Sequence, residues 1–241
     1  MNATERRQKV VLLFLFALSV AVYDCAKAAE PPAAEGRYLA ADAIDARTVL
    51  AEPPADNSEI TRSEIEHMLT LQAARTPADV KHLNAEGTFS PSLLTEVLGE
   101  SFKSDSLPAT AALMKFVSAD AKAIIGAAKS RWKRSRPWVV DNRIQPCIEK
   151  PTSFSYPSDR AAQSRVWAMV LCELFPTSKD ALIAKAERIS QDRVLSGVHF
   201  PSDIEAGKKL GQAIADRITQ SPVFKADLTA ARAEITKSNR P

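Results

Sequence analysis

The sequence predicts an all-α fold, a single-domain helical bundle. Only seven glycines occur in 241 residues, and no long run alternates apolar with polar residues, so a sheet is not indicated. A serine or threonine also stands directly before a proline at Thr76-Pro77, Ser90-Pro91 and Ser221-Pro222. Each pair places a capping residue ahead of a proline at the first helical position, and therefore predicts the start of a helix.

The remaining helices follow from capping and composition. Ser63 and Glu66 have the spacing of a capping box ahead of an apolar segment. Residues 108–132 are rich in alanine and predict a long helix that ends in a basic run. Three more helices are expected from Ser158 to Leu174, from Ser178 towards Arg193, and onward from a cap at Ser202.

Two of these helices are expected to pack at the centre of the bundle. The segment Ser158–Leu174 begins polar and becomes almost wholly apolar, as a buried helix does. After Ser202, Gly207 and Gly211 lie four residues apart on one apolar face. Because glycine has no side chain, a neighbouring helix is expected to approach closely at these two positions.

Residues 1–28 have the layout of a secretory signal peptide. Three basic residues precede the uncharged 13-residue run Val10–Val22, and Ala26-Lys27-Ala28 supplies a cleavage site. A membrane anchor is disfavoured, since spanning a bilayer takes roughly 20 apolar residues. Cys25 would suggest a lipoprotein, but Asp24 is a poor residue to precede a lipidated cysteine. We expect a periplasmic or secreted protein, with no membrane attachment after cleavage.

Residues 29–60 are expected to form an irregular lead-in, and residues 61–241 the helical domain. Removing residues 1–28 deletes four basic and two acidic residues, which lowers the net charge from +3 to +1. A nearly neutral protein is a poor partner for nucleic acid, whose binding needs many phosphate contacts. Whether Cys147 and Cys172 form a disulfide stays open, as does a homo-oligomer.

Three segments carry residues suited to binding an anion. The first contains Lys129 and Arg136, within a run that has five positive charges from residue 129 to residue 136. Pro137 forces Arg136 out of helical geometry. Lys133 and Arg134, between Lys129 and Arg136, are expected to be solvated and to flank the anion-binding residues. Taken alone, the run is more typical of a solvated helix end, where cations interact well with the helix dipole.

The second and third segments add a helix start and a histidine. Pro157-Ser158 would cap a helix whose free amides can bind an anion, although a plain cap is the simpler interpretation. Asp203 follows His199 by four residues, so it can hold the Nδ1–H of the ring and leave Nε2 as a nucleophile. The other two histidines, His67 and His82, have the pattern of surface or packing residues.

Together the segments Lys129-x6-Arg136-Pro137, Pro157-Ser158 and Arg193-x5-His199-x3-Asp203 resemble the signature of the type-2 phosphatidic acid phosphatase superfamily. Within that superfamily the chain looks most like bacterial class A non-specific acid phosphatases. The likeness covers roughly residues 35–235. It implies a helical bundle of the acid phosphatase and vanadium haloperoxidase type.

The resemblance also implies a role for each matching position. His199 would attack phosphorus and become phosphohistidine, with Asp203 orienting it. The implied substrate is a small phosphorylated compound, and inorganic phosphate would bind the same site. Three fixed cations supply the charge that a metal would, so neither a metal nor another cofactor is expected. The phosphate oxygens would be bound by Lys129, Arg136, Ser158 and Arg193.

The second motif departs from the family pattern Pro-Ser-Gly-His, because Asp159 and Arg160 replace the glycine and the histidine. That histidine would protonate the leaving group, which an arginine with a pKa above about 12 cannot do usefully. Asp159 either repels substrate or turns away to pair with Arg160. In the third motif, Asp192 stands where the family usually has serine.

The sequence therefore favours a periplasmic, metal-independent acid phosphatase whose activity is reduced or lost. A general acid contributes typically 10²–10⁴-fold, so its absence is compatible with a slow enzyme. A non-catalytic protein that binds phosphate or a phosphorylated ligand is the alternative. A vanadate-dependent peroxidase, which shares the anion site, is disfavoured because it also needs the histidine missing at Arg160.

Overall fold

The computed structural model describes residues 36–85, 89–102 and 107–238, and the expected signal peptide lies outside them. Every regular element within these ranges is helical, so the predicted all-α fold is confirmed. The elements are α1 (Ala46–Val49), α2 (Glu59–Ala74), α3 (Pro77–Ala85), α4 (Ser92–Thr95), η1 (Glu96–Ser101), α5 (Pro108–Trp132), α6 (Pro137–Val140), α7 (Asp159–Leu174), η3 (Pro176–Ser178), α8 (Lys179–Leu195), α9 (Pro201–Gln220) and α10 (Pro222–Ser238).

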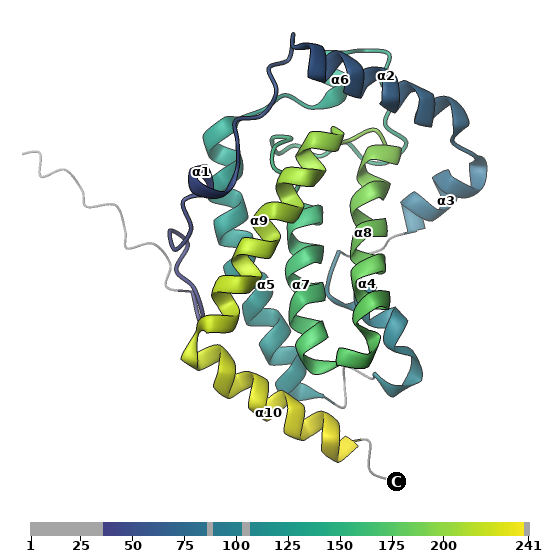
Figure 1. Cartoon of the computed structure of the whole chain (residues 1–241). Helices are drawn as coiled ribbons and strands as arrows, with labels where there is room; N and C mark the ends of the chain where they lie inside the picture. The colour runs from purple at the N-terminus through teal and green to yellow at the C-terminus, as the bar shows by residue number, and fades with distance from the viewer. Residues whose placement is uncertain (1–35, 86–88, 103–106, 239–241) are drawn as a thin grey trace, which may run out of the picture. The chain divides into compact units, whose positions relative to one another are not determined.

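The helix α7 is the centre of the bundle, as its apolar sequence predicts. It packs against α5, α8 and α9, and Figure 1 shows α7 between α8 and α9, with α10 crossing one end of the bundle. Val166, Trp167 and Leu171 on this helix are almost completely buried. Burying such side chains supplies roughly 1.5–3 kcal/mol each, which makes α7 a rigid support for the residues at its N-terminus.

The two glycines of α9 allow α7 and α9 to approach each other closely, which confirms that prediction. A Cβ atom on Gly207 would lie 2.5 Å from the backbone oxygen of Ser158, and one on Gly211 would lie 2.3 Å from that of Ala162. Both distances are too short for any side chain. The contact places the start of α7 beside the first turns of α9, where the third motif ends.

Several predicted helix starts are confirmed, and two caps are wrong. The starts at Pro77, Pro108 and Pro222, and the cap at Ser158, agree with the sequence, whereas α4 begins one residue after the Ser90-Pro91 pair. Ser58, not Ser63, caps α2, because its hydroxyl accepts the N–H of Thr61. The helix α9 begins at Pro201, ahead of Ser202, whose hydroxyl instead donates to Glu64 at 3.0 Å.

Residues 36–58 are irregular except for α1, but hydrogen bonds fasten this segment to the bundle. The buried carboxylate of Asp120 in α5 accepts the backbone N–H groups of Arg37, Tyr38 and Leu39 at 3.1, 2.7 and 3.0 Å. The guanidinium of Arg37 also donates to Asp227 of α10 at 2.7 Å. Because three donors satisfy it, the buried charge of Asp120 can be kept in the fold.

Two further findings concern the chain as a whole. Among the helices that the structure describes, none is both long and apolar enough to cross a membrane. Cys147 and Cys172 are both half-buried and are not joined by a disulfide.

Candidate active site

His199 lies in the turn between α8 and α9 and is only 1% exposed. Its Nδ1 is 3.3 Å from Oδ2 of Asp203, and its Nε2 is 2.9 Å from Nη1 of Arg136. A guanidinium can only donate hydrogen bonds, so Nε2 accepts and the ring proton lies on Nδ1, towards Asp203. Burial lowers the pKa of His199, and contacts with Asp159 and Asp203 oppose this only in part. The imidazole is therefore kept neutral.

Asp203 is fully buried behind the ring and is held by three donors besides His199. The hydroxyl of Ser155 and the N–H of Phe200 donate to Oδ2 at 2.6 and 2.9 Å, and Arg134 donates to Oδ1 at 2.7 Å. Burial raises the pKa of Asp203, but the hydrogen bond of His199, the charge of Arg134 and the hydrogen bond of Ser155 outweigh it and lower the pKa to about 2. The carboxylate stays ionised and fixes the imidazole.

Arg136 and Lys129 lie on the Nε2 side of the ring. Arg136 has the extended backbone expected before proline, with φ −81° and ψ 154°, and its Nη1 also donates to the carbonyl of Val198 at 2.7 Å. Lys129, in the last turn of α5, donates to the carbonyl of Phe154 at 2.7 Å. Burial lowers the pKa of Lys129, which the charge of Asp159 partly offsets.

Asp159, at the first position of α7, also faces the Nε2 side of His199. Its Oδ1 is 3.7 Å from Nζ of Lys129 and 3.8 Å from Nε2 of His199. Burial raises the pKa of Asp159, but the charges of Lys129 and Arg136 outweigh it and hold the pKa well below its usual range. These two contacts turn the carboxylate of Asp159 towards Lys129 and His199.

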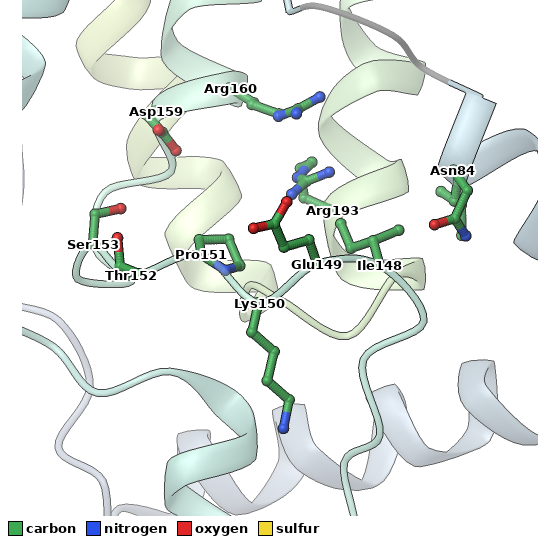
Figure 2. Close-up of a pocket in the computed structure, with 11 residues that line it drawn as sticks. Asn84, Ile148, Glu149, Lys150, Pro151, Thr152, Ser153, Asp159, Arg160 and Arg193 are labelled. Atoms are coloured by element: carbon green, nitrogen blue, oxygen red, sulfur yellow. The ribbon is translucent and has the colours of Figure 1, made fainter.

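A pocket of about 560 Å³ opens beside this cluster and is lined by Asp159, Arg160 and Arg193, among others. Figure 2 shows Arg160 from α7 and Arg193 from α8 reaching towards the same part of the pocket, with the loop 148–153 below them. The guanidinium carbon of Arg160 lies 4.8 Å from the ring centroid of Phe89. Asp159 lines this pocket and also contacts His199, which is not itself among the lining residues.

Ser158 has a structural role at this end of α7. Its hydroxyl accepts the N–H of Ala161 at 3.4 Å, and its own N–H donates to the carbonyl of Asp203 at 2.9 Å. The first bond caps α7, and the second keeps the start of α7 next to α9. The first bond is long, which leaves the buried hydroxyl able to turn towards a ligand at the helix N-terminus.

Arg134 was expected in the solvated flank of the basic run, and this prediction is wrong. Arg134 is only 4% exposed and donates to Asp203 and, at 3.2 Å, to Glu64. The physical reason is that Asp203 and Glu64 are both buried carboxylates, which must be neutralised by a buried cation. Lys133, which is exposed as expected and has a left-handed backbone, ends α5 beside it.

Asp192 lies apart from the cluster. Its carboxylate is 2.9 Å from Nε2 of His82 and 2.9 Å from Nε of Arg188. His82 therefore has a specific partner beyond the surface or packing role expected from its sequence. The negative charge of Asp192 is balanced by Arg188, so it adds no net charge near His199.

Sequence reasoning missed three residues that support Asp203, namely Ser155, Arg134 and Glu64. No local signal could have found Arg134, since it stands next to Lys133, an exposed cation, in the non-helical stretch 133–136. Glu64 gave no signal either, because it looks like an ordinary polar position of an amphipathic helix.

No group of three or more His, Cys, Asp or Glu side chains that could hold a metal ion occurs in the part of the chain described. The charge at the site instead comes from lysine and arginine side chains.

The comparison with protein families places these residues in a known class. The model of the PAP2 superfamily matches residues 109–225, a range that includes all three segments. Residues 109–225 thus match the PAP2 superfamily, the type-2 phosphatidic acid phosphatases, as the motifs predict.

Its relatives include bacterial acid phosphatases. The chain is 26% identical to the non-specific acid phosphatase of Salmonella typhimurium over 95% of this chain and 93% of that protein. It is 29% identical to the acid phosphatase of Zymomonas mobilis over 47% of this chain and 45% of the other. A phosphatidylglycerolphosphate phosphatase of Bacillus subtilis, known from its crystal structure, aligns with a TM-score of 0.46 and 20% identity over 68% of this chain and 87% of the other.

Proposed function

We propose that this protein is a metal-independent phosphomonoesterase of the acid phosphatase type that works through a phosphohistidine at His199. The observation that carries the proposal is the orientation of the ring. Nδ1 is paired with Asp203, while Nε2 faces Arg136 and the neighbourhood of Lys129. Full-length similarity to a non-specific acid phosphatase supports the same activity.

The chemistry follows from this orientation in two steps. The lone pair of Nε2 attacks phosphorus, and the bond from phosphorus to the ester oxygen breaks, so that the leaving oxygen keeps its electron pair and takes a proton. Water then attacks phosphorus, loses a proton, and returns the electron pair of the P–N bond to Nε2. Throughout, Asp203 accepts the Nδ1–H and stabilises the positive charge that the phosphorylated ring carries.

Electrostatics supplies the rest of the catalysis. Phosphoryl transfer needs mainly positioning and neutralisation of the charge on the three equatorial oxygens. Lys129, Arg136 and Arg193 would bind these oxygens, and Ser158 with the amides of α7 would complete the site. Because burial lowers the pKa of His199, the nucleophile stays neutral further into the acid range than a free histidine. Activity at acidic pH is therefore expected.

Two residues are expected to reduce this activity. The carboxylate of Asp159 stands among the cations that the phosphate needs, so a substrate must displace it or bind beside it. Arg160 replaces the family's general acid, and a guanidinium is not a useful proton donor to a leaving group. The leaving oxygen must then take its proton from water, which slows the departure of poor leaving groups.

The same two observations favour the second candidate function, a non-catalytic phosphate-binding protein. In that case the cations would hold phosphate, but His199 would not be phosphorylated. We also propose export to the periplasm, on the evidence of the signal-like residues 1–28. N-terminal sequencing of the secreted protein is expected to begin near Ala29, and a mature chain that begins at Met1 would contradict export.

The decisive experiment measures release of p-nitrophenolate from p-nitrophenyl phosphate together with the acid-labile phosphoryl group on the protein. The wild type should give both signals and His199→Ala neither. His67→Ala, which alters an exposed histidine of α2, is the matched control and should behave as the wild type. Phosphate binding without turnover or labelling would favour the non-catalytic protein.

A further inference from the structure

A buried network behind Asp203 has no part in the chemistry proposed so far. Nη1 of Arg134 donates to Oδ1 of Asp203 at 2.7 Å and to the hydroxyl of Ser202 at 2.8 Å. Its guanidinium carbon lies 4.1 Å from the ring centroid of Phe200, which covers one face of the cation. A bridging guanidinium of this kind holds its partners in a fixed geometry, because its donors form a rigid fork.

The network continues from Arg134 to α2. Nη2 of Arg134 donates to Oε2 of Glu64 at 3.2 Å. The other oxygen of Glu64 accepts the backbone N–H of Ser202, in the first turn of α9. Glu64 thus neutralises Arg134 and also occupies the positive end of the α9 dipole. Since α9 carries Asp203, one carboxylate of α2 is linked to the partner of His199 through a single arginine.

We propose that Arg134 and Glu64 are positioning residues for His199, which hold Asp203 against Nδ1 and together set the electrostatic balance of the ring. The proposal rests on the function proposed for His199, but its main measurement does not require turnover. The proposal places Arg134 on the Nδ1 side of His199, behind Asp203, whereas Lys129 and Arg136 lie on the Nε2 side.

The balance can be stated from the charges that face His199. Two carboxylates, Asp203 of α9 and Asp159 of α7, favour the protonated ring. Three cations oppose protonation of the ring: Arg136 ahead of α6, Lys129 of α5, and Arg193 of α8, which lines the pocket beside Asp159. Behind Asp203, the charges of Arg134 and Glu64 act in opposite senses. Removing the positive charge should stabilise the imidazolium, and removing the negative charge should destabilise it.

The experiment is an NMR titration of the histidine side chains in the purified protein. Only three histidines occur in the chain, so the signals of His199 can be assigned with single His→Ala variants. In Arg134→Gln the pKa of His199 should rise, and in Glu64→Gln it should fall, each by about half a unit to one unit. The double variant should return it towards the wild-type value.

Glu66→Gln is the matched control. Glu66 lies on the same helix and pairs with a cation, Arg143, at 2.8 Å, but both side chains are exposed and contact none of the residues around Asp203 in the described structure. The control should leave the titration unchanged. A merely structural role for the network would give no shifts of opposite sign, so equal titration curves in all variants would overturn the proposal.

Two further readouts keep the test conclusive. If His199 stays neutral over the whole range in which the protein is folded, exchange of its Nδ1 proton with solvent is measured, and it should be faster in Arg134→Gln and unchanged in Glu66→Gln. If Arg134→Gln does not fold, the nearly isosteric variant Glu64→Gln tests the proposal, because it should lower the pKa of His199. An unaltered proton exchange or an upward shift in Glu64→Gln would overturn the proposal.

Kinetics separate this inference from the proposed function. With p-nitrophenyl phosphate, Arg134→Gln should lower kcat by roughly 10–100-fold with little change in KM, because a displaced nucleophile slows the chemical step more than binding. Arg134→Lys retains the charge and should recover part of that loss. Absence of turnover in the wild type would contradict the proposed function, and the titration would still support or overturn the positioning role.

Discussion

Two aspartates flank His199, and their surroundings differ sharply. Asp203 lies behind Nδ1, is fully buried, and accepts hydrogen bonds of 2.6–2.9 Å from Ser155, Phe200 and Arg134. Asp159 lies before Nε2, has a side chain that is 41% exposed, and makes its closest charged contacts at 3.7 and 3.8 Å. Contacts of that length are ion pairs without good hydrogen bonds.

The difference shows that the same residue type can have two different roles at one site, depending on its surroundings. A buried carboxylate is tolerated only when donors satisfy it, and a carboxylate satisfied in this way cannot move easily. Asp203 is therefore a fixed orienting group. Asp159 borders the pocket, keeps contact with solvent, and is held mainly by charge, so an incoming phosphate can compete with it for the same cations.

Removing the charge of Asp203 should have the largest effect on activity. In Asp203→Asn the amide cannot accept the Nδ1–H as a carboxylate does, so kcat with p-nitrophenyl phosphate should fall on the order of 10³-fold. Stability should also fall by about 3–5 kcal/mol, since Arg134 loses a buried counter-charge. Steady-state kinetics and thermal unfolding measure the two effects.

Asp120→Asn is the matched control for this loss of stability. Asp120 is also a buried aspartate with three strong hydrogen bonds, but its partners are the backbone groups of residues 37–39. The control should destabilise the fold while kcat of the folded protein stays near the wild-type value. A similar loss of kcat in both variants would mean that Asp203 acts through stability alone.

Restoring the family pattern on the Asp159 side should have the next largest effect, and in the opposite direction. The double change Asp159→Gly with Arg160→His supplies a general acid and removes the competing carboxylate. Turnover of an alkyl phosphate such as glycerol phosphate should rise on the order of 10²-fold. Turnover of p-nitrophenyl phosphate should change much less, because an aryl leaving group departs without a proton.

The wild type should already show this dependence on the leaving group. We expect measurable hydrolysis of aryl phosphates and poor hydrolysis of alkyl phosphates. Equal rates on both would show that another group donates the proton. No turnover of either, before or after the double change, would favour the phosphate-binding protein.

A smaller effect is expected when only the charge of Asp159 is removed. Asp159→Asn should bind inorganic phosphate about tenfold more tightly, since a unit charge facing a dianion at a partly solvated site costs on the order of 1–2 kcal/mol. Because the pKa of Asp159 lies well below its usual range, the residue is ionised throughout the folded range. The ratio of the two affinities, measured by calorimetry, should therefore be larger at about pH 8 than at about pH 5, because inorganic phosphate is mainly a dianion at the higher pH and mainly a monoanion at the lower one.

The helices were largely predictable, because their signals are local. Proline at the first position of α3, α5 and α10 and the cap at Ser158 depend only on neighbouring residues. The two wrong caps have specific reasons. Ser58, five residues before Ser63, offers a second capping serine, and the hydroxyl of Ser202 is engaged by Glu64, more than a hundred residues away.

The site was predictable only as far as its motifs extend. The motif positions identify His199, Arg136 and Lys129 as candidates, but the orientation of Asp159 depends on Lys129 and His199, which other helices bring to it. The burial of Arg134 depends in the same way on Glu64 of α2. Charge patterns along a sequence do not indicate which cation will be needed inside the fold.

The smallest expected effect is that of a chelator, which should leave activity unchanged. The charge on the transferring phosphoryl group is neutralised by Lys129, Arg136 and Arg193 in the proposed mechanism, so no metal ion is required. The measurement compares kcat before and after EDTA at constant ionic strength. Loss of activity that a divalent ion restores would contradict the mechanism. Such an ion would bind the substrate together with Asp159, so metal dependence that disappears in Asp159→Asn would make this carboxylate a ligand instead of a competitor.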